Sequence, residues 1–214
     1  MVDASLYRSE AIPISWVRRR HATRDSAVGL MIGLGMMAAC IAVLYFCGSA
    51  IPEASTGFQG SVLAVAALAT IANTAMQEVM VRGYAQQTIQ KEFGLLNGVI
   101  FSALLFLVLH LGATQGAILP MISLFATGIL LGTAYVVTGN LWLPIALHFG
   151  WNFLQGPVLG ETVSGRANNT GWRLFHLTGP PLMTGGKFGI EGGSIAIIIT
   201  ILGTPIVLLA FRRR

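Results

Sequence analysis

The sequence predicts an all-α membrane protein, a polytopic bundle of about six transmembrane helices. Hydrophobic residues make up 54% of the 214 residues and charged residues only 10%, whereas a typical soluble domain carries about 25% charged residues. The charges are also unevenly placed along the chain. No Asp, Glu, Lys or Arg occurs between Asp25 and Glu53, between Glu92 and Glu161, or from residue 192 to residue 211.

These uncharged stretches are long enough to cross a bilayer as helices. About 20 apolar residues span the hydrocarbon layer, which is roughly 30 Å thick. In lipid, every backbone N–H and C=O needs a partner within the protein, which favours helices. A transmembrane β-barrel would need alternating apolar and polar residues, and runs such as residues 100–111 do not alternate.

The chain divides into a basic N-terminal segment, residues 1–26, and a transmembrane domain, residues 27–214. Within this domain, turn-forming Gly, Pro and Asn residues separate the apolar stretches. Residues 156–193 form a long polar loop rich in Gly and Pro. The spans are expected at residues 27–46, 61–84, 95–111, 117–137, 141–155 and 194–211.

Arginine gathers near both ends of the chain and predicts its orientation in the membrane. The net charge is +5, and an even number of spans puts both termini on one side. Because Lys and Arg next to spans stay in the cytoplasm, both termini are expected there, with their basic groups against membrane lipid. No aromatic-basic pattern stands out, so nucleic acid is not expected as a partner. The arginines concerned are Arg8, Arg18, Arg19, Arg20, Arg24 and Arg212 to Arg214.

The long polar loop contributes ionisable groups of its own. With both termini in the cytoplasm, this loop faces the opposite side, and its basic residues weaken the charge asymmetry without reversing it. Its acids Glu161 and Glu191, together with His176, are expected to be solvated and are given no role.

Ionisable residues inside a span need an explanation, because each costs at least about 2.5–3.5 kcal/mol on insertion scales. The first set is Gln77, Glu78 and Arg82, near the end of the second expected span. Glu78 and Arg82 are four residues apart, so they share a helix face and can pair. The simplest interpretation is an ion pair at the interface, with Arg82 extending to the membrane surface, but we expect a partly buried pair that anchors the end of this span.

Two further sets lie on later spans. His110 stands near the end of the third span, where a single histidine is most often a packing residue. His148 and Asn152 share a face of the fifth span, and Gly150 between them lets a neighbouring helix approach closely. Hydrogen bonding between helices would be enough to explain this pair.

The three sets fall on different helices, and a helical bundle can bring such side chains to one interior pocket. A carboxylate or an imidazole can take a proton from water, and an imidazole and an amide can hold a developing oxyanion. The residue types therefore suit hydrolysis of a carbonyl group. Two histidines and a glutamate are alternatively a set that binds a metal ion, usually zinc. The candidate site residues are Gln77, Glu78, Arg82, His110, His148 and Asn152.

Three short motifs resemble the CPBP intramembrane proteases, a family that includes the CAAX-processing endopeptidases of prenylated proteins and bacteriocin-related immunity proteins. The family pattern is E-E-x-x-x-R, F-x-x-x-H and H-x-x-x-N, each on a membrane helix. The order and the helical setting match here, and the segments VRGY and GNLWLPIALHFGWNF are similar too. The resemblance covers about residues 67–160. The matching positions are Gln77-Glu78 with Arg82, Phe106 with His110, and His148 with Asn152.

The resemblance implies a glutamate-type endopeptidase that acts on a membrane-associated or lipidated peptide. It assigns His110 to the activation of water, His148 and Asn152 to the oxyanion, and Glu78 with Arg82 to a structural pair. The family's first glutamate, which activates water together with the first histidine, is replaced here by Gln77. An amide has no useful basicity, although it can hydrogen-bond and position water.

The glutamine leaves three explanations open. Glu78 or a histidine can take over as the base, the protein can be a non-catalytic relative, or a deliberate change from glutamate to glutamine traps an inactive state. The leading prediction is intramembrane hydrolysis of a peptide bond, either glutamate-type or metal-assisted. The alternative is a non-catalytic membrane immunity or scaffolding protein with the same fold. A small transporter is less favoured, because the sequence shows no internal repeat.

Overall fold

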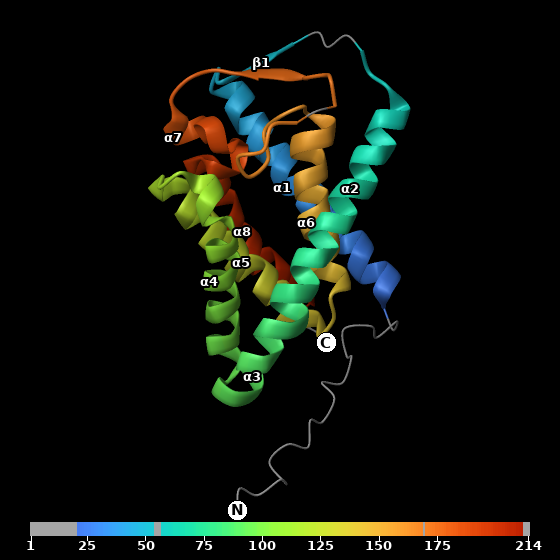
Figure 1. Ribbon diagram of the computed structural model, residues 1–214, viewed down its shortest axis with the longest axis vertical. Coiled ribbons are helices and arrows are strands. Elements are labelled where there is room, and N and C mark those ends of the chain that lie inside the picture. Colours follow the sequence, from blue (N-terminus) through green and yellow to red (C-terminus); the bar gives the residue numbers. More distant parts are fainter. Residues whose placement is uncertain (1–20, 54–56, 169, 212–214) are drawn as a thin grey trace, which may run out of the picture.

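The computed structural model describes residues 21–53, 57–168 and 170–211. The predicted orientation rests on arginines near both termini. Of these, Arg24 is described, and the others lie outside the described residues. The described chain is an all-α bundle with one short pair of strands, and its elements are shown in Figure 1. The all-α membrane fold predicted from the sequence is confirmed.

Five helical runs in the described residues are long and apolar enough to cross a membrane. The first is α1, Ala22–Phe46, which begins five residues before the span expected at 27–46. The second is a continuous run, Gly60–Phe93, of 34 residues, made of α2, the π-helix η3 and α3. The others are α4 (Leu95–Thr114), α5 (Ile118–Thr138) and α8 (Ser194–Phe211).

The span expected at residues 141–155 is shorter than the others. It consists of α6, Trp142–Phe153, with 12 residues, followed by the π-helix η4, Leu154–Val158, with 5 residues. A left-handed turn at Gly139, with φ of 63°, precedes α6. Pro157, which has no N–H to donate, lies in η4. These two features limit the helical run, although α6 still packs inside the bundle.

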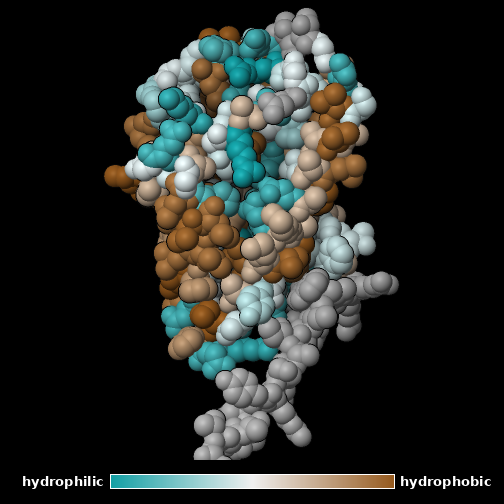
Figure 2. Space-filling model, viewed as in Figure 1, coloured by the Kyte–Doolittle hydropathy of each residue, from teal (hydrophilic) through white to brown (hydrophobic). Residues whose placement is uncertain are grey.

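The helices run alternately from one end of the bundle to the other, as Figure 1 shows for α1, α2, α4, α5, α6 and α8. The first and last helices therefore bring the two ends of the described chain together. The guanidinium carbon of Arg24 in α1 lies 5.7 Å from the ring centre of Phe211 in α8. On the face of the bundle that Figure 2 shows, apolar side chains form large patches along the sides, as lipid contact requires.

Helices α1 and α6 cross at very short range because glycines line the crossing. A Cβ atom at Gly33 would lie 2.1 Å from the carbonyl oxygen of Leu147, and one at Gly29 would lie 2.5 Å from that of Leu143. From the other side, a Cβ at Gly150 would lie 2.9 Å from the carbonyl oxygen of Leu30. The close approach expected at Gly150 therefore exists, and α1 is the helix that approaches.

The π-helix η3, Val79–Gln86, begins directly after Glu78 and turns two polar side chains towards α5. Arg82 Nη2 donates to the carbonyl oxygen of Gly128 at 3.2 Å, and Gln86 Nε2 donates to that of Gly132 at 3.0 Å. Because η3 packs against α5 in this way, its polar side chains satisfy backbone groups inside the bundle instead of facing lipid.

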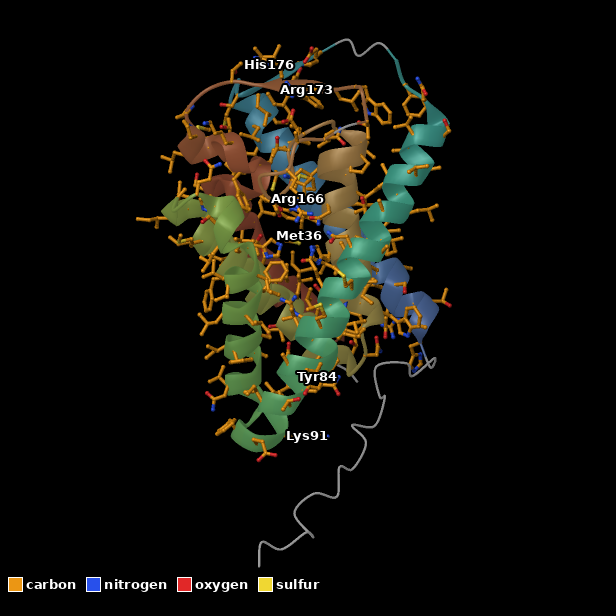
Figure 3. All side chains as sticks on the ribbon, in the orientation of Figure 1. Met36, Tyr84, Lys91, Arg166, Arg173 and His176 are labelled. Atoms are coloured by element: carbon orange, nitrogen blue, oxygen red, sulfur yellow. The ribbon has the colours of Figure 1, made fainter. Side chains whose placement is uncertain are left out.

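The segment between η4 and α8 closes one end of the bundle and is more ordered than a plain polar loop. Strand β1, Ala50–Pro52, pairs antiparallel with β2, Phe175–Leu177. Then follow α7 (Pro181–Thr184) and the 3-10 helices η5 (Gly186–Phe188) and η6 (Ile190–Gly192). Figure 3 places Arg173 and His176 at this end, Lys91 at the opposite end, and Arg166 nearer the middle.

Candidate active site

Glu78, at the end of α2, is the centre of a buried ionic cluster. Its Oε1 atom accepts a hydrogen bond from Arg82 Nη1 at 3.0 Å and one from His148 Nδ1 at 2.9 Å. The side chains of Glu78 and Arg82 are both 0% exposed. The pair therefore lies inside the bundle. The interpretation that placed it at the membrane surface is wrong.

Arg82 is bound on three sides. Besides Glu78 and the carbonyl oxygen of Gly128, its guanidinium carbon lies 4.8 Å from the ring centre of Phe106 in α4, a cation–π contact. Burying a charge is costly unless it is paired and hydrogen-bonded. These contacts tie α2, η3, α4 and α5 together around one charge.

The contact with Glu78 fixes which ring nitrogen of His148 carries a proton. An ionised carboxylate can only accept hydrogen bonds, so Nδ1 must donate. In the neutral ring, Nε2 then has a free lone pair that can accept a proton. In the imidazolium form, Nε2 also carries a proton, and this is the donor that an oxyanion needs.

Phe106 connects the two histidines. Its ring centre is 4.6 Å from that of His110 and 5.7 Å from that of His148. Nδ1 of His110 lies 2.8 Å from the backbone carbonyl oxygen of Phe106, and since that oxygen can only accept, Nδ1 is the donor here too. Nε2 of neutral His110 is therefore also free to accept a proton.

His148 and Asn152, one helical turn apart on α6, line a cavity inside the bundle together with Phe106, Ser164 and Glu191. The centre of a water-sized sphere can occupy a volume of about 20 Å³ in this cavity. On the same measure, about 10–15 Å³ is enough to hold one water molecule. Gln77, Glu78 and His110 are not among the lining residues. The structure thus brings the predicted site residues close together, but not all of them around one cavity.

Gln77 precedes Glu78 in α2, and its side-chain oxygen is buried without a hydrogen-bond partner. The second carboxylate oxygen of Glu78, Oε2, is buried and unpartnered as well. A buried polar atom without a partner costs about 1–3 kcal/mol. Two such atoms thus lie on successive residues of α2, one of them on the carboxylate that His148 contacts.

The expectation that Glu161 and Glu191 are solvated is wrong. Glu161 is only 7% exposed, and burial raises the pKa of its carboxyl group, although Arg173 opposes this. Glu191 lines the cavity beside His148, and burial raises the pKa of its carboxyl group as well. The burial of these two glutamates could not be predicted from the sequence, because they lie in a Gly-rich loop outside every span. No local pattern shows that such a loop folds back into the bundle.

The described residues contain no group of three or more His, Cys, Asp and Glu side chains arranged to hold a metal ion. The two histidines and the glutamate that suggested zinc are present, but two of them pair with each other and the third contacts the backbone. Nδ1 of His148 contacts the Glu78 carboxylate, and Nδ1 of His110 contacts a backbone carbonyl group.

Comparison with known proteins gives one match. Residues 59–154 match the family model described as type II CAAX prenyl endopeptidase, Rce1-like. No curated protein and no solved structure matches the chain. The matched region contains Gln77, Glu78, Arg82, His110, His148 and Asn152. Residues 59–154 of this chain are therefore a domain of the Rce1-like type II CAAX prenyl endopeptidase family, within the CPBP proteins that its motifs resemble.

Proposed function

We propose that this protein is an intramembrane endopeptidase that hydrolyses a peptide bond in a membrane-associated or lipidated peptide. One observation carries the proposal. His148 is held by the buried Glu78–Arg82 pair on one side and, with Asn152, lines a water-sized cavity on the other. A packing histidine would need neither a carboxylate partner nor a cavity.

The roles of the residues follow from their contacts. Glu78 and Arg82 form the structural pair that orients His148. His148, as imidazolium, and the amide of Asn152 are the donors for the oxyanion that forms when water attacks the carbonyl carbon. His110, with a free Nε2, lies near this centre and helps to move the proton of the attacking water.

The surroundings of the site favour a substrate that reaches it from the bilayer. An apolar hollow of about 580 Å³ lies between η3 and α4 and is lined by Val79, Tyr84, Phe101, Leu105 and Leu109. Val79 follows Glu78, and Leu105 and Leu109 flank Phe106 and His110 in the sequence. The prenyl chain of a prenylated peptide would fit such a hollow beside the ionic cluster.

The direct test is cleavage by the purified protein in detergent or liposomes. The probe is a prenylated peptide with a C-terminal CAAX sequence, compared with the same peptide without its prenyl group. We expect the prenylated form to be cleaved preferentially. Cleavage with and without a chelator separates the glutamate-type from the metal-assisted mechanism.

Asn152→Ala should reduce kcat by about 10²–10³-fold, the usual loss when one oxyanion donor is removed. Asn97→Ala is the matched control, because Asn97 is exposed on α4 and only donates to the carbonyl oxygen of Phe93. Equal activity of the two variants would contradict the role of Asn152.

A second candidate function rests on Gln77. A non-catalytic relative that binds peptides or membrane proteins needs no base, and glutamine at this position fits such a protein. A non-catalytic protein would bind the prenylated peptide without releasing any product. The same assay therefore separates the two functions, provided that binding and product release are both measured.

The orientation of the chain is the last part of the proposal. The two ends of the described chain lie at the same end of the bundle, and arginine is concentrated at both termini. Both termini should therefore lie in the cytoplasm. Reporter fusions placed after Arg20 and after Arg214 are expected to report the cytoplasmic side, and opposite sides for the two would refute this topology.

A further inference from the structure

The cavity beside His148 contains a carboxylate that no motif provides. Glu191 belongs to η6, the short helix before α8, and lies in the cavity wall with His148 and Asn152 of α6. Among the described residues that line the cavity, Glu191 alone is acidic. Glu78 does not line it, and its Oε1 atom is engaged by both Arg82 and His148.

The fold holds Glu191 in this position with several contacts. The backbone N–H and the hydroxyl group of Ser164 both donate to Oε1 of Glu191, the hydroxyl group at 2.7 Å. Trp151 of α6 lines the same cavity wall. The hydroxyl group of Ser123 in α5 donates to the backbone carbonyl oxygen of Glu191. Ser164 thus holds the carboxylate, and Ser123 holds the backbone of the same residue.

The backbone before Glu191 is shaped for this approach. Gly189 has φ of 102°, and a Cβ there would lie 2.1 Å from the carbonyl oxygen of Thr162. Only glycine allows the chain to pass at this distance and at this angle. The loop therefore packs tightly enough to keep Glu191 at the cavity.

Glu191 has the properties of a base for water in this cavity. A carboxylate has about four lone-pair sites, and the two donors of Ser164 leave sites for water. Its ionisable neighbour is His148, while its other close partners are neutral. Burial, the largest influence, raises the pKa of Glu191 above its usual range, which is the direction that a general base requires.

We infer that Glu191 takes the proton from the attacking water and so supplies the carboxylate that is missing at Gln77. This inference rests on the proposed peptidase function and adds a catalytic residue to it. The residue that acts as the base then lies in a loop that folds back into the bundle, and not in the first membrane motif. Gln77, with its unpartnered side-chain oxygen, is left to position water or substrate.

The step balances as an ordinary hydrolysis. Glu191 accepts one proton from water while the water oxygen bonds to the carbonyl carbon, and the carbonyl π pair moves to oxygen. His148 and Asn152 stabilise that oxyanion. When the intermediate collapses, the C–N bond breaks and the leaving nitrogen takes the proton from the Glu191 carboxyl group. The products are a carboxylic acid and an amine, and the carboxylate is restored.

The first test is Glu191→Gln in the full-length protein, with the prenylated CAAX peptide as the probe. The amide keeps the size of the side chain and an oxygen that can accept from Ser164. Cleavage should fall by about 10²–10⁴-fold, the usual contribution of general-base catalysis. Glu161→Gln is the matched control, because Glu161 is a buried loop carboxylate that does not line the cavity. It should keep wild-type activity.

The second test is Ser164→Ala, which leaves the carboxylate in place. The hydrogen bonds from Ser164 lower the pKa of Glu191, so loss of the hydroxyl group should raise it. Because the base must be ionised, activity falls as the pH drops through this pKa. The acid limb of the kcat/KM profile should therefore move to higher pH in the variant. A merely structural role for Glu191 would not move it.

The outcomes are distinguishable. Wild-type cleavage that survives Glu191→Gln, or an acid limb that stays in place in Ser164→Ala, would overturn the role of Glu191 and leave the proposed function standing. A wild-type protein that binds the prenylated peptide without cleaving it would overturn both. If Glu191→Gln does not fold, the pH profile of Ser164→Ala decides alone.

Discussion

Replacing Arg82 with alanine is expected to lower the free energy of unfolding by about 3–5 kcal/mol, which is the usual cost of removing one partner of a buried ion pair. The change leaves the Glu78 carboxylate inside the bundle without its cation, with His148 as its remaining hydrogen-bond partner. It also removes the bond to the carbonyl oxygen of Gly128 and the contact with the Phe106 ring. Unfolding in mixed detergent micelles, followed by circular dichroism, measures the loss.

Lys91→Ala is the matched control for Arg82→Ala. Lys91 is exposed in α3, on the same continuous helical run, so its removal should change stability by less than about 0.5 kcal/mol. A double-mutant cycle with Glu78→Gln separates the ion pair from the other contacts of Arg82. Because the two groups touch, the effects should be less than additive. Equal stabilities of Arg82→Ala and Lys91→Ala would mean that the pair is solvated.

The helices and the ion pair could be predicted because their signals are local. Uncharged stretches of about 20 residues indicate spans wherever they occur, and Glu78 and Arg82 are related by one helical turn. The length of α6 was less predictable, since Gly139 and Pro157 limit a run that is otherwise as apolar as a full span. The depth of the ion pair was also hidden, because burial depends on α5 and not on spacing.

Other features arise from contacts between distant parts of the chain. The hydrogen bond between His148 and Glu78 joins residues 70 positions apart, and no pattern within either helix indicates which side chains will meet. Glu191 is the clearest example. Its sequence neighbourhood is glycine-rich and polar, as in a solvated loop, yet Ser123 and Ser164 hold it in the bundle. The three motifs therefore point to Glu78 and His148 but not to Glu191.

A carboxylate at position 77 should replace the one at position 191. In the Glu191→Gln protein, we expect Gln77→Glu to raise kcat/KM by about 10²–10⁴-fold, the range of general-base catalysis. The substitution is nearly isosteric, so the packing of α2 should survive. It places a carboxylate where a buried amide oxygen now has no partner, next to Glu78, which contacts His148.

The same substitution in the wild-type protein decides where the base is. If Glu191 already takes the proton, a second carboxylate adds little, and Gln77→Glu should change kcat/KM by less than about 10-fold, far below the 10²–10⁴-fold range of a new general base. A gain within that range in the wild-type background would instead show that the natural protein lacks a working base, which would contradict the role of Glu191. The matched control is Gln87→Glu, a buried glutamine in α3 that only donates to the carbonyl oxygen of Gly83. It should rescue nothing, because its added charge has no contact with His148.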